Sequence, residues 1–280
     1  MRVMRVLLGA TAFIARPPKG GTARAVRYGQ RVRGRLVTAR NADPANGILL
    51  WIHGGGLISG SPRLDQGLAG LYSERSGLPV FVPRYRLAPE HPFPAAADDV
   101  LDAYIALLHQ GYPADRIRVG GISAGGVLVT GLLGDLGRGG LPMPAGALLV
   151  SALLDLSAES ARRCDAANPD PCCSPAFIER TSKAYTGDTP LSHPRLEVLG
   201  TDMRDWPPVL VQVGSTECVV GEAKQLGAAM RAAGGSCEVQ IWPGQVHGFV
   251  GLGAKTVPEA RAALDYGAEF LSACAAGSRR

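Results

Sequence analysis

The sequence predicts an α/β protein with a mainly parallel central sheet covered by helices on both faces. Short, continuous apolar runs alternate with longer amphipathic segments along most of the chain, which is typical of buried parallel strands joined by helices. Glycine and proline, 37 and 21 of the 280 residues, supply turns between these segments. With 46% hydrophobic residues, the chain is long enough to form a large core, and we expect one domain spanning residues 1–280.

The first third of the chain predicts an edge hairpin followed by the start of the parallel sheet. Arginine alternates with apolar residues in two runs, about 24–29 and 31–39, as expected of an antiparallel strand pair at a sheet edge. These arginines belong to the densest basic stretch of a chain with net charge +5, but no nucleic-acid-binding motif accompanies them, so we interpret them as a solvent-facing side. The further elements expected here are a strand at Ile48–Ile52, a helix at 65–76, a strand within 78–86 and a helix at Ala95–Gln110.

The remaining chain continues the alternation except over Asp155–Asp205, which is rich in proline and serine and predicts one helix, Pro175–Tyr185. About fifty residues are too many for a simple connection, so we expect a small cap built from about 155–205 and the N-terminal residues 1–22. The predicted strands are Ile117–Gly120, Ala147–Leu153, Val209–Val213 and Glu238–Trp242, and the predicted helices are Val127–Leu136, Val219–Ala233 and Pro258–Ala275.

The N-terminus contains an apolar run, Val6–Ala15, that is too short to span a bilayer. We expect it to form a retained helix, with an export or membrane-surface signal as the alternative. The six cysteines form no C-x-x-C pair, which predicts free thiols in a reducing cytosol, and the adjacent Cys172 and Cys173 are interpreted as an incidental loop pair. These features favour a cytoplasmic protein without an integral membrane span.

The segment Gly121-Ile122-Ser123-Ala124-Gly125 matches G-x-S-x-G between a predicted strand and a predicted helix. A serine exposed on such a sharp turn needs strained backbone angles, and side chains at the glycine positions would collide. The following helix directs its free amides toward the same point. The motif alone also fits an incidental glycine-rich turn, but this context favours a nucleophilic serine.

A second signal is the run His53-Gly54-Gly55-Gly56 at the end of a buried strand. Bare glycines let peptide N–H groups point into a cleft, where they can hold the negative oxygen of a tetrahedral intermediate. No Gly-Lys-Ser/Thr follows, which excludes a P-loop, and a purely structural turn is the remaining alternative.

A serine needs a base at neutral pH, and His247 is the best of the five histidines. It follows the last predicted strand in the glycine-flanked loop GQVHGF, a position that often carries function. His53 belongs to the glycine run and is expected to brace it. Of the other three, His91 lies among prolines, His109 at the end of a predicted helix and His193 in the predicted cap.

The acid that orients His247 should come between the serine and the histidine in the chain. Glu217 lies just past the carboxyl end of a predicted strand, where open α/β sheets build their sites. Glu222 is expected on the solvated face of the next helix, and Asp202 and Asp205 precede the strand and so lie at its wrong end. The alternative is that Glu217 caps that helix while Glu222 or an aspartate orients the histidine.

Five motifs occur in order from about Ile48 onward: HGGG, YRLAPEHPFPAAADD, GISAGG, PPVLVQVGSTE and VHGF. In this combination the chain resembles the bacterial hormone-sensitive-lipase-like esterases, which are α/β-hydrolases. The resemblance implies the α/β-hydrolase fold, no cofactor or metal, and a triad of Ser123 as nucleophile, Glu217 as acid and His247 as base. The oxyanion hole that it implies consists of the amides of Gly55, Gly56 and Ala124.

The chain departs from the family pattern at three points. Ile122 stands where relatives often carry Asp, so any contribution of that side chain comes from packing instead of charge. The acid is Glu rather than the commoner Asp. Only 52 residues precede the HGGG run, which predicts a reduced cap and a more open pocket.

We therefore expect a carboxylesterase that hydrolyses short- to medium-chain esters through an acyl-enzyme. The alternatives are an amidase or lactonase with the same triad, and a non-catalytic ligand-binding protein of this fold such as the plant gibberellin receptors, which lack the catalytic histidine. The expected partner is a small ester rather than nucleic acid or membrane, with a homodimer left open.

Overall fold

One eight-stranded sheet forms the centre of the molecule, with the strand order β1-β2-β4-β3-β5-β6-β7-β8. In this computed structural model, which describes residues 19–274, β2 pairs antiparallel with both β1 and β4. All the other neighbouring strands are parallel, as the alternating pattern predicts. The strands are β1 (Thr22–Tyr28), β2 (Val32–Thr38), β3 (Ile48–Ile52), β4 (Val80–Pro83), β5 (Ile117–Ile122), β6 (Gly146–Val150), β7 (Val209–Gly214) and β8 (Cys237–Trp242).

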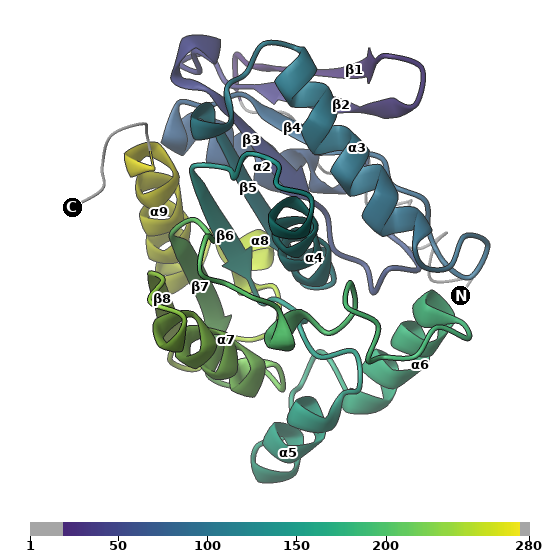
Figure 1. Ribbon diagram of the computed structural model, residues 1–280. Coiled ribbons are helices and arrows are strands. Elements are labelled where there is room, and N and C mark those ends of the chain that lie inside the picture. The colour runs from purple at the N-terminus through teal and green to yellow at the C-terminus, as the bar shows by residue number, and fades with distance from the viewer. Residues whose placement is uncertain (1–18, 275–280) are drawn as a thin grey trace.

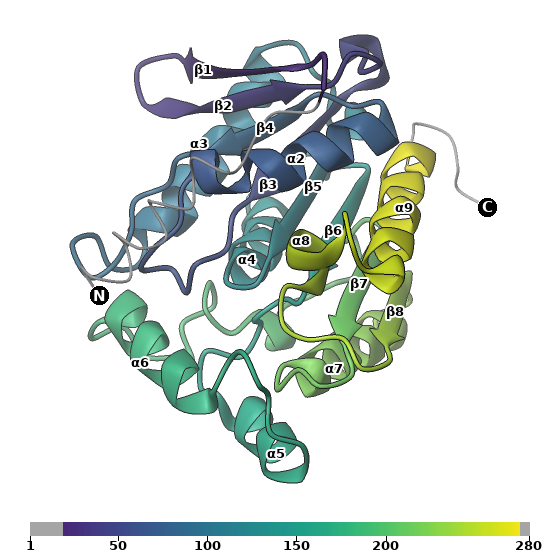
Figure 2. The same ribbon diagram turned by 180° about the vertical axis from the view of Figure 1, so that it is seen from behind.

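Helices cover both faces of the sheet and form a separate hydrophobic core on each (Figures 1 and 2). One face is covered by α3 (Ala95–His109), α4 (Gly125–Arg138) and α7 (Val220–Ala232). The other is covered by α2 (Pro62–Ser76), α8 (Phe249–Gly253) and α9 (Pro258–Ala273), which lie in front of the sheet in Figure 2. This is the α/β-hydrolase arrangement.

Two predicted boundaries were wrong for local reasons. The predicted strand to Leu153 ends at Val150, because Ser151 has a φ of 47° and turns the chain away from the sheet. The helix predicted from residue 65 begins at Pro62, because the Ser61 side chain caps it by accepting a hydrogen bond from the Leu64 amide at 3.3 Å.

Residues 155–205 contain two helices where one was predicted, α5 (Glu159–Ala167) and α6 (Pro175–Thr186). Both lie beyond the carboxyl ends of the parallel strands (Figure 1). The nine-residue α5 buries only Ser160 and Ala161, so it has almost no apolar stripe from which to predict it. The other predicted cap segment, 1–22, and the apolar run inside it fall almost wholly outside the described residues.

Four arginines of the edge hairpin face solvent, as their interpretation as a solvent-facing group predicts: Arg24, Arg27, Arg31 and Arg33 are all exposed. They do not share one face of the hairpin, because Arg24 and Arg27 are three residues apart in β1 and side chains alternate along a strand. Within residues 19–274, no helix is long and apolar enough to cross a bilayer.

Candidate active site

Ser123 lies on the sharp turn that joins β5 to α4, and its φ of 56° is in the left-handed region. The flanking glycines are required by close packing. A Cβ on Gly125 would lie 2.2 Å from the Ile52 carbonyl oxygen, and one on Gly121 would lie 2.8 Å from backbone atoms of Gly125. The Ser123 amide donates to the Val150 carbonyl at 2.9 Å, which anchors the turn to the neighbouring strand.

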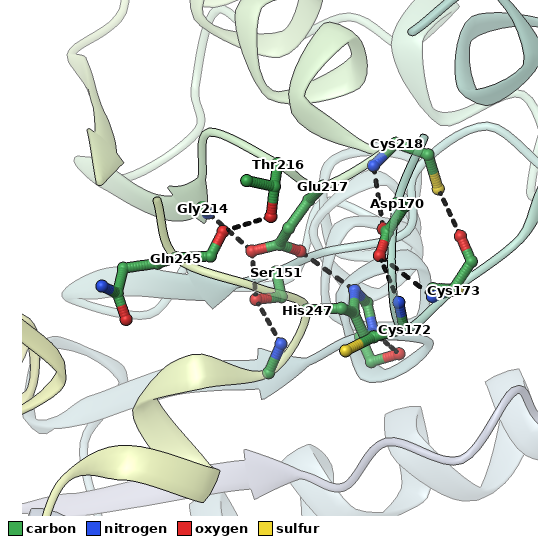
Figure 3. Close-up of polar contacts among 12 residues, drawn as sticks. Ser151, Asp170, Cys172, Cys173, Gly214, Thr216, Glu217, Cys218, Gln245 and His247 are labelled. Carbon is green, nitrogen blue, oxygen red and sulfur yellow. Dashed lines mark hydrogen bonds and ion pairs between the residues drawn. The ribbon is translucent and has the colours of Figure 1, made fainter. Parts of the chain in front are cut away.

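The three residues predicted to form the triad are in hydrogen-bond contact although they come from distant loops. His247 Nε2 lies 2.8 Å from Ser123 Oγ, and His247 Nδ1 lies 2.9 Å from Glu217 Oε2. The Glu217 side chain is completely buried and that of His247 is 16% exposed. Figure 3 shows Glu217 directed at the imidazole from the loop after β7.

A residue that the sequence did not single out, Ser151, fixes the other oxygen of Glu217. Its hydroxyl donates to Glu217 Oε1 at 2.8 Å and accepts from the Gly248 amide at 3.0 Å, so it ties the acid to the histidine loop (Figure 3). The Gly214 amide donates to the same carboxylate oxygen at 2.6 Å. A lone serine after a strand carries no sequence signal for this role.

The Glu217 carboxylate also governs the protonation of His247. Burial lowers the pKa of the imidazole, but the hydrogen bond and negative charge of Glu217 outweigh this, and the pKa is raised above its ordinary value of 6.5. With Nδ1–H donated to Glu217, the neutral ring presents Nε2 as an acceptor to the serine hydroxyl. This is the arrangement a general base needs.

His53 braces the glycine run, as expected from the sequence. Burial lowers its pKa to about 4, so the ring is neutral, and its Nδ1–H donates to the Gly54 carbonyl at 2.8 Å. The Tyr85 ring stacks on the His53 ring with 4.1 Å between the ring centroids, and the Tyr85 hydroxyl donates a hydrogen bond to the His53 carbonyl at 2.9 Å. Tyr85 begins the YRLAPEHPFP segment, so two of the sequence motifs form one structural unit.

The glycine run lies directly against the serine turn. A Cβ on Gly54 would be 3.1 Å from Ser123 Cβ. The three amides expected as oxyanion donors, those of Gly55, Gly56 and Ala124, donate no hydrogen bond within residues 19–274. They are therefore available to an incoming oxygen atom.

A largely apolar cleft of about 780 Å³ opens onto Ser123 and His247. Ile122 lines it, and its Cδ1 would be 3.6 Å from a Cβ on Gly251. The side chain beside the nucleophile therefore belongs to the apolar lining of the cleft. The other apolar residues lining the cleft include Leu64, Leu68, Leu71, Leu252 and Ala254.

Glu222 is not on a solvated face, and this expectation was wrong. It is completely buried, and its Oε2 accepts from the amides of Leu154 at 2.5 Å and Asp155 at 2.9 Å. It thus anchors the loop after β6 to the start of α7, whereas the two ring nitrogens of His247 contact Glu217 and Ser123. Burial raises its pKa to about 8, against the opposing effect of the two amides.

We expect Glu222 to make the fold less stable as the pH rises. Its carboxyl binds a proton more tightly in the folded chain, so stability falls between its ordinary pKa of 4.5 and about 8, by up to ~1.4 kcal/mol per pH unit. Urea unfolding of the wild type and of Glu222→Gln from pH 5 to 9 measures this. The free energy of unfolding of the variant relative to that of the wild type should increase as the pH rises. A difference that stays constant with pH would contradict the prediction.

Within residues 19–274, no group of three or more His, Cys, Asp and Glu side chains is arranged to hold a metal ion.

Comparison with known proteins identifies the family to which the fold belongs. The sequence profile of a family described as alpha/beta hydrolase fold matches residues 49–251. An acetyl-hydrolase of Streptomyces hygroscopicus is 34% identical over 223 residues, which cover 80% of this chain and 74% of the relative. An esterase of Acinetobacter venetianus is 33% identical, covering 86% of this chain and 79% of the relative.

Solved structures extend the similarity over nearly the whole chain. A hormone-sensitive lipase from a metagenome library superposes with a TM-score of 0.91 at 32% identity, covering 98% of this chain and 91% of that one. This chain is an α/β-hydrolase of the hormone-sensitive-lipase-like family. The esterase EstE5, solved after soaking with p-nitrophenyl butyrate, superposes with a TM-score of 0.89 at 29% identity over 98% of this chain and 90% of its own. This hormone-sensitive-lipase-like enzyme is accordingly a carboxylic ester hydrolase.

Proposed function

We propose that this enzyme hydrolyses short- to medium-chain carboxylic esters with Ser123 as nucleophile, His247 as general base and Glu217 as the orienting acid. The single observation that carries the proposal is the continuous hydrogen-bonded chain from Ser123 Oγ through the imidazole to Glu217, at 2.8 and 2.9 Å. A non-catalytic binding role would not require this complete chain.

The mechanism follows from these contacts. His247 Nε2 takes the proton of Ser123 as its oxygen attacks the ester carbonyl, and then donates it to the leaving alcohol. Water repeats the sequence on the acyl-enzyme and releases the acid. Glu217 stabilises the imidazolium in both halves and holds its tautomer.

The negative oxygen of each tetrahedral intermediate is assigned to the amides of Gly55, Gly56 and Ala124. Two observations support this assignment. The glycine run contacts the serine turn, and within the described residues no acceptor is bonded to these three amides. Each well-aligned donor contributes about 3 kcal/mol to lowering the barrier.

We assign residues 155–205 as a cap over this centre. Side chains of α6 reach the glycine run, since a Cβ on Gly56 would be 3.2 Å from Thr181 Cγ2 and 3.3 Å from Phe177 Cζ. A bulky acyl or alcohol group near Gly56 would therefore meet this helix. The apolar cleft on the other side of Ser123 leaves room for a short or medium chain.

The substrate range is tested with p-nitrophenyl esters of increasing acyl length, together with an anilide and a lactone. We expect the highest kcat/KM for short to medium acyl chains, in line with the soaked butyrate ester of EstE5 and the acetyl-hydrolase relative. Faster turnover of the anilide or lactone would favour an amidase or lactonase, and no turnover at all would remove the proposal.

The pH dependence of kcat/KM should show an acidic limb with its inflection above 6.5. The active form carries neutral His247, whose pKa Glu217 holds above the ordinary value, so activity is lost as the pH falls through that raised value. The buried His53, with a pKa of about 4, titrates too low to produce this limb. A profile flat to about pH 4 would contradict His247 as the base.

A further inference from the structure

Three of the six cysteines converge beside the Glu217–His247 pair. Cys172 and Cys173 lie in the loop between α5 and α6, and Cys218 follows Glu217 directly. Asp170 gathers their backbones: one carboxylate oxygen accepts the Cys172 and Cys173 amides at 2.8 and 3.0 Å, and the other accepts the Cys218 amide at 2.9 Å (Figure 3). The adjacent pair is therefore part of an organised cluster rather than an incidental feature of a loop.

Cys173 and Cys218 are in direct contact. The Cys218 thiol donates to the Cys173 carbonyl oxygen at 3.1 Å (Figure 3). Cys172 is exposed, Cys173 is 8% exposed and Cys218 is fully buried.

The two paired thiols differ in acidity. The neighbouring Cys218 side chain lowers the pKa of Cys173 against the opposing effect of burial, and the nearby charge of His247 acts in the same direction as Cys218. The neighbouring Cys173 side chain, together with burial, raises the pKa of Cys218. A more acidic thiol beside a less acidic one supplies a nucleophile and a resolving partner.

We propose that Cys173 and Cys218 are an oxidisable dithiol, and that peroxides convert it to a reversible disulfide that lowers esterase activity. The Cys173 thiolate attacks one peroxide oxygen, so an S–O bond forms as the O–O bond breaks, and the other oxygen leaves as water after taking up a proton. Cys218 sulfur then attacks the sulfenic sulfur, an S–S bond forms, and the S–O oxygen leaves with the Cys218 proton as a second water. Two thiols and one hydrogen peroxide give one disulfide and two waters.

The loss of activity follows from where the two cysteines are attached, and this part rests on the proposed role of Glu217. The sulfurs must come within about 2 Å of each other, which draws the 170–173 loop and the Cys218 backbone together. Cys218 follows Glu217 directly in the chain, and the Glu217 carboxylate is 2.9 Å from His247 Nδ1. The acid is therefore displaced from the imidazole.

The test treats reduced enzyme with hydrogen peroxide and then with dithiothreitol. Ester hydrolysis is followed throughout, and disulfides are mapped by non-reducing peptide mass spectrometry with fragmentation. We expect a Cys173–Cys218 link, a fall in kcat/KM of at least about fivefold, and recovery with dithiothreitol. The variants Cys173→Ser and Cys218→Ser should resist peroxide, whereas Cys172→Ser and the distant control Cys237→Ser should respond like the wild type.

Each other outcome overturns the proposal. These outcomes are no Cys173–Cys218 link, a link between Cys172 and Cys173 instead, a link without loss of activity, or equal loss in Cys218→Ser. If Cys173→Ser does not fold, the comparison uses Cys218→Ser, and its thermal unfolding curve under reducing conditions establishes that this variant is folded. An enzyme inactive on esters before oxidation would refute the proposed function instead, and the disulfide map would still report on the cysteine pair.

Discussion

Replacing Ser123 with alanine is expected to lower kcat for p-nitrophenyl butyrate by about 10⁴-fold or more, with little change in KM. The hydroxyl forms the covalent intermediate, so its loss removes the acyl-enzyme route and leaves only the stabilisation supplied by the oxyanion donors and by binding. Ester binding in the apolar cleft does not depend on that hydroxyl. Steady-state hydrolysis over a range of substrate concentrations separates the two parameters.

Covalent labelling provides a second readout for the same variant. Phenylmethylsulfonyl fluoride should add one sulfonyl group to the wild type, detected by intact mass, and none to Ser123→Ala. Ser272→Ala is the matched control, because its hydroxyl bonds the carbonyls of Ser76 and Ala268 at 2.9 Å, away from the proposed site. Retained labelling or retained activity in Ser123→Ala would place the nucleophile elsewhere.

The second large effect is expected from the pair Glu217→Gln and Glu222→Gln. At position 217 a glutamine removes the charge that stabilises the imidazolium and can offer an N–H to His247 Nδ1, which favours the wrong tautomer, so kcat should fall about 10⁴-fold. At position 222 the same change lies away from the imidazole and should alter kcat less than about threefold. Both glutamates are buried, so the comparison separates chemistry from burial.

Circular dichroism and thermal unfolding at pH 6 would establish that both variants are folded. If Glu222→Gln instead loses most of the activity while Glu217→Gln retains it, the orienting acid is wrongly assigned. Equal losses would mean that both act through the loops they anchor.

Much of the fold was predictable because its signals are local. Most of the parallel strands are short, mainly apolar runs, and β3 and β5 appear in the structure close to their predicted bounds. The elements that were missed or misplaced lack such signals. The helix α5 has little apolar periodicity, and the end of β6 is set by the backbone of one residue, Ser151.

The residues of the candidate site also fall into those with a local sequence signal and those without one. Ser123 and the glycine run could be found from the sequence, since strained turns and close backbone approaches restrict which residues are sterically allowed. The buried state of Glu222 could not be found, because it depends on amides of Leu154 and Asp155 that lie 68 and 67 positions away in the chain. The hydrophobic periodicity of α7 indicates that one side of the helix is buried, but it does not identify Glu222 as a buried residue.

By itself, the sequence determined the α/β alternation, the serine turn with its bare glycines, and the order of serine, acid and histidine along the chain. Those features depend on backbone geometry and on side-chain volume over a few neighbouring residues. Only the tertiary structure decided that Ser151 holds Glu217, that Glu222 is an internal anchor, and that Cys173 meets Cys218 beside the acid. Each of these is a contact between segments at least 45 residues apart, which arises when the sheet brings the ends of its strands together.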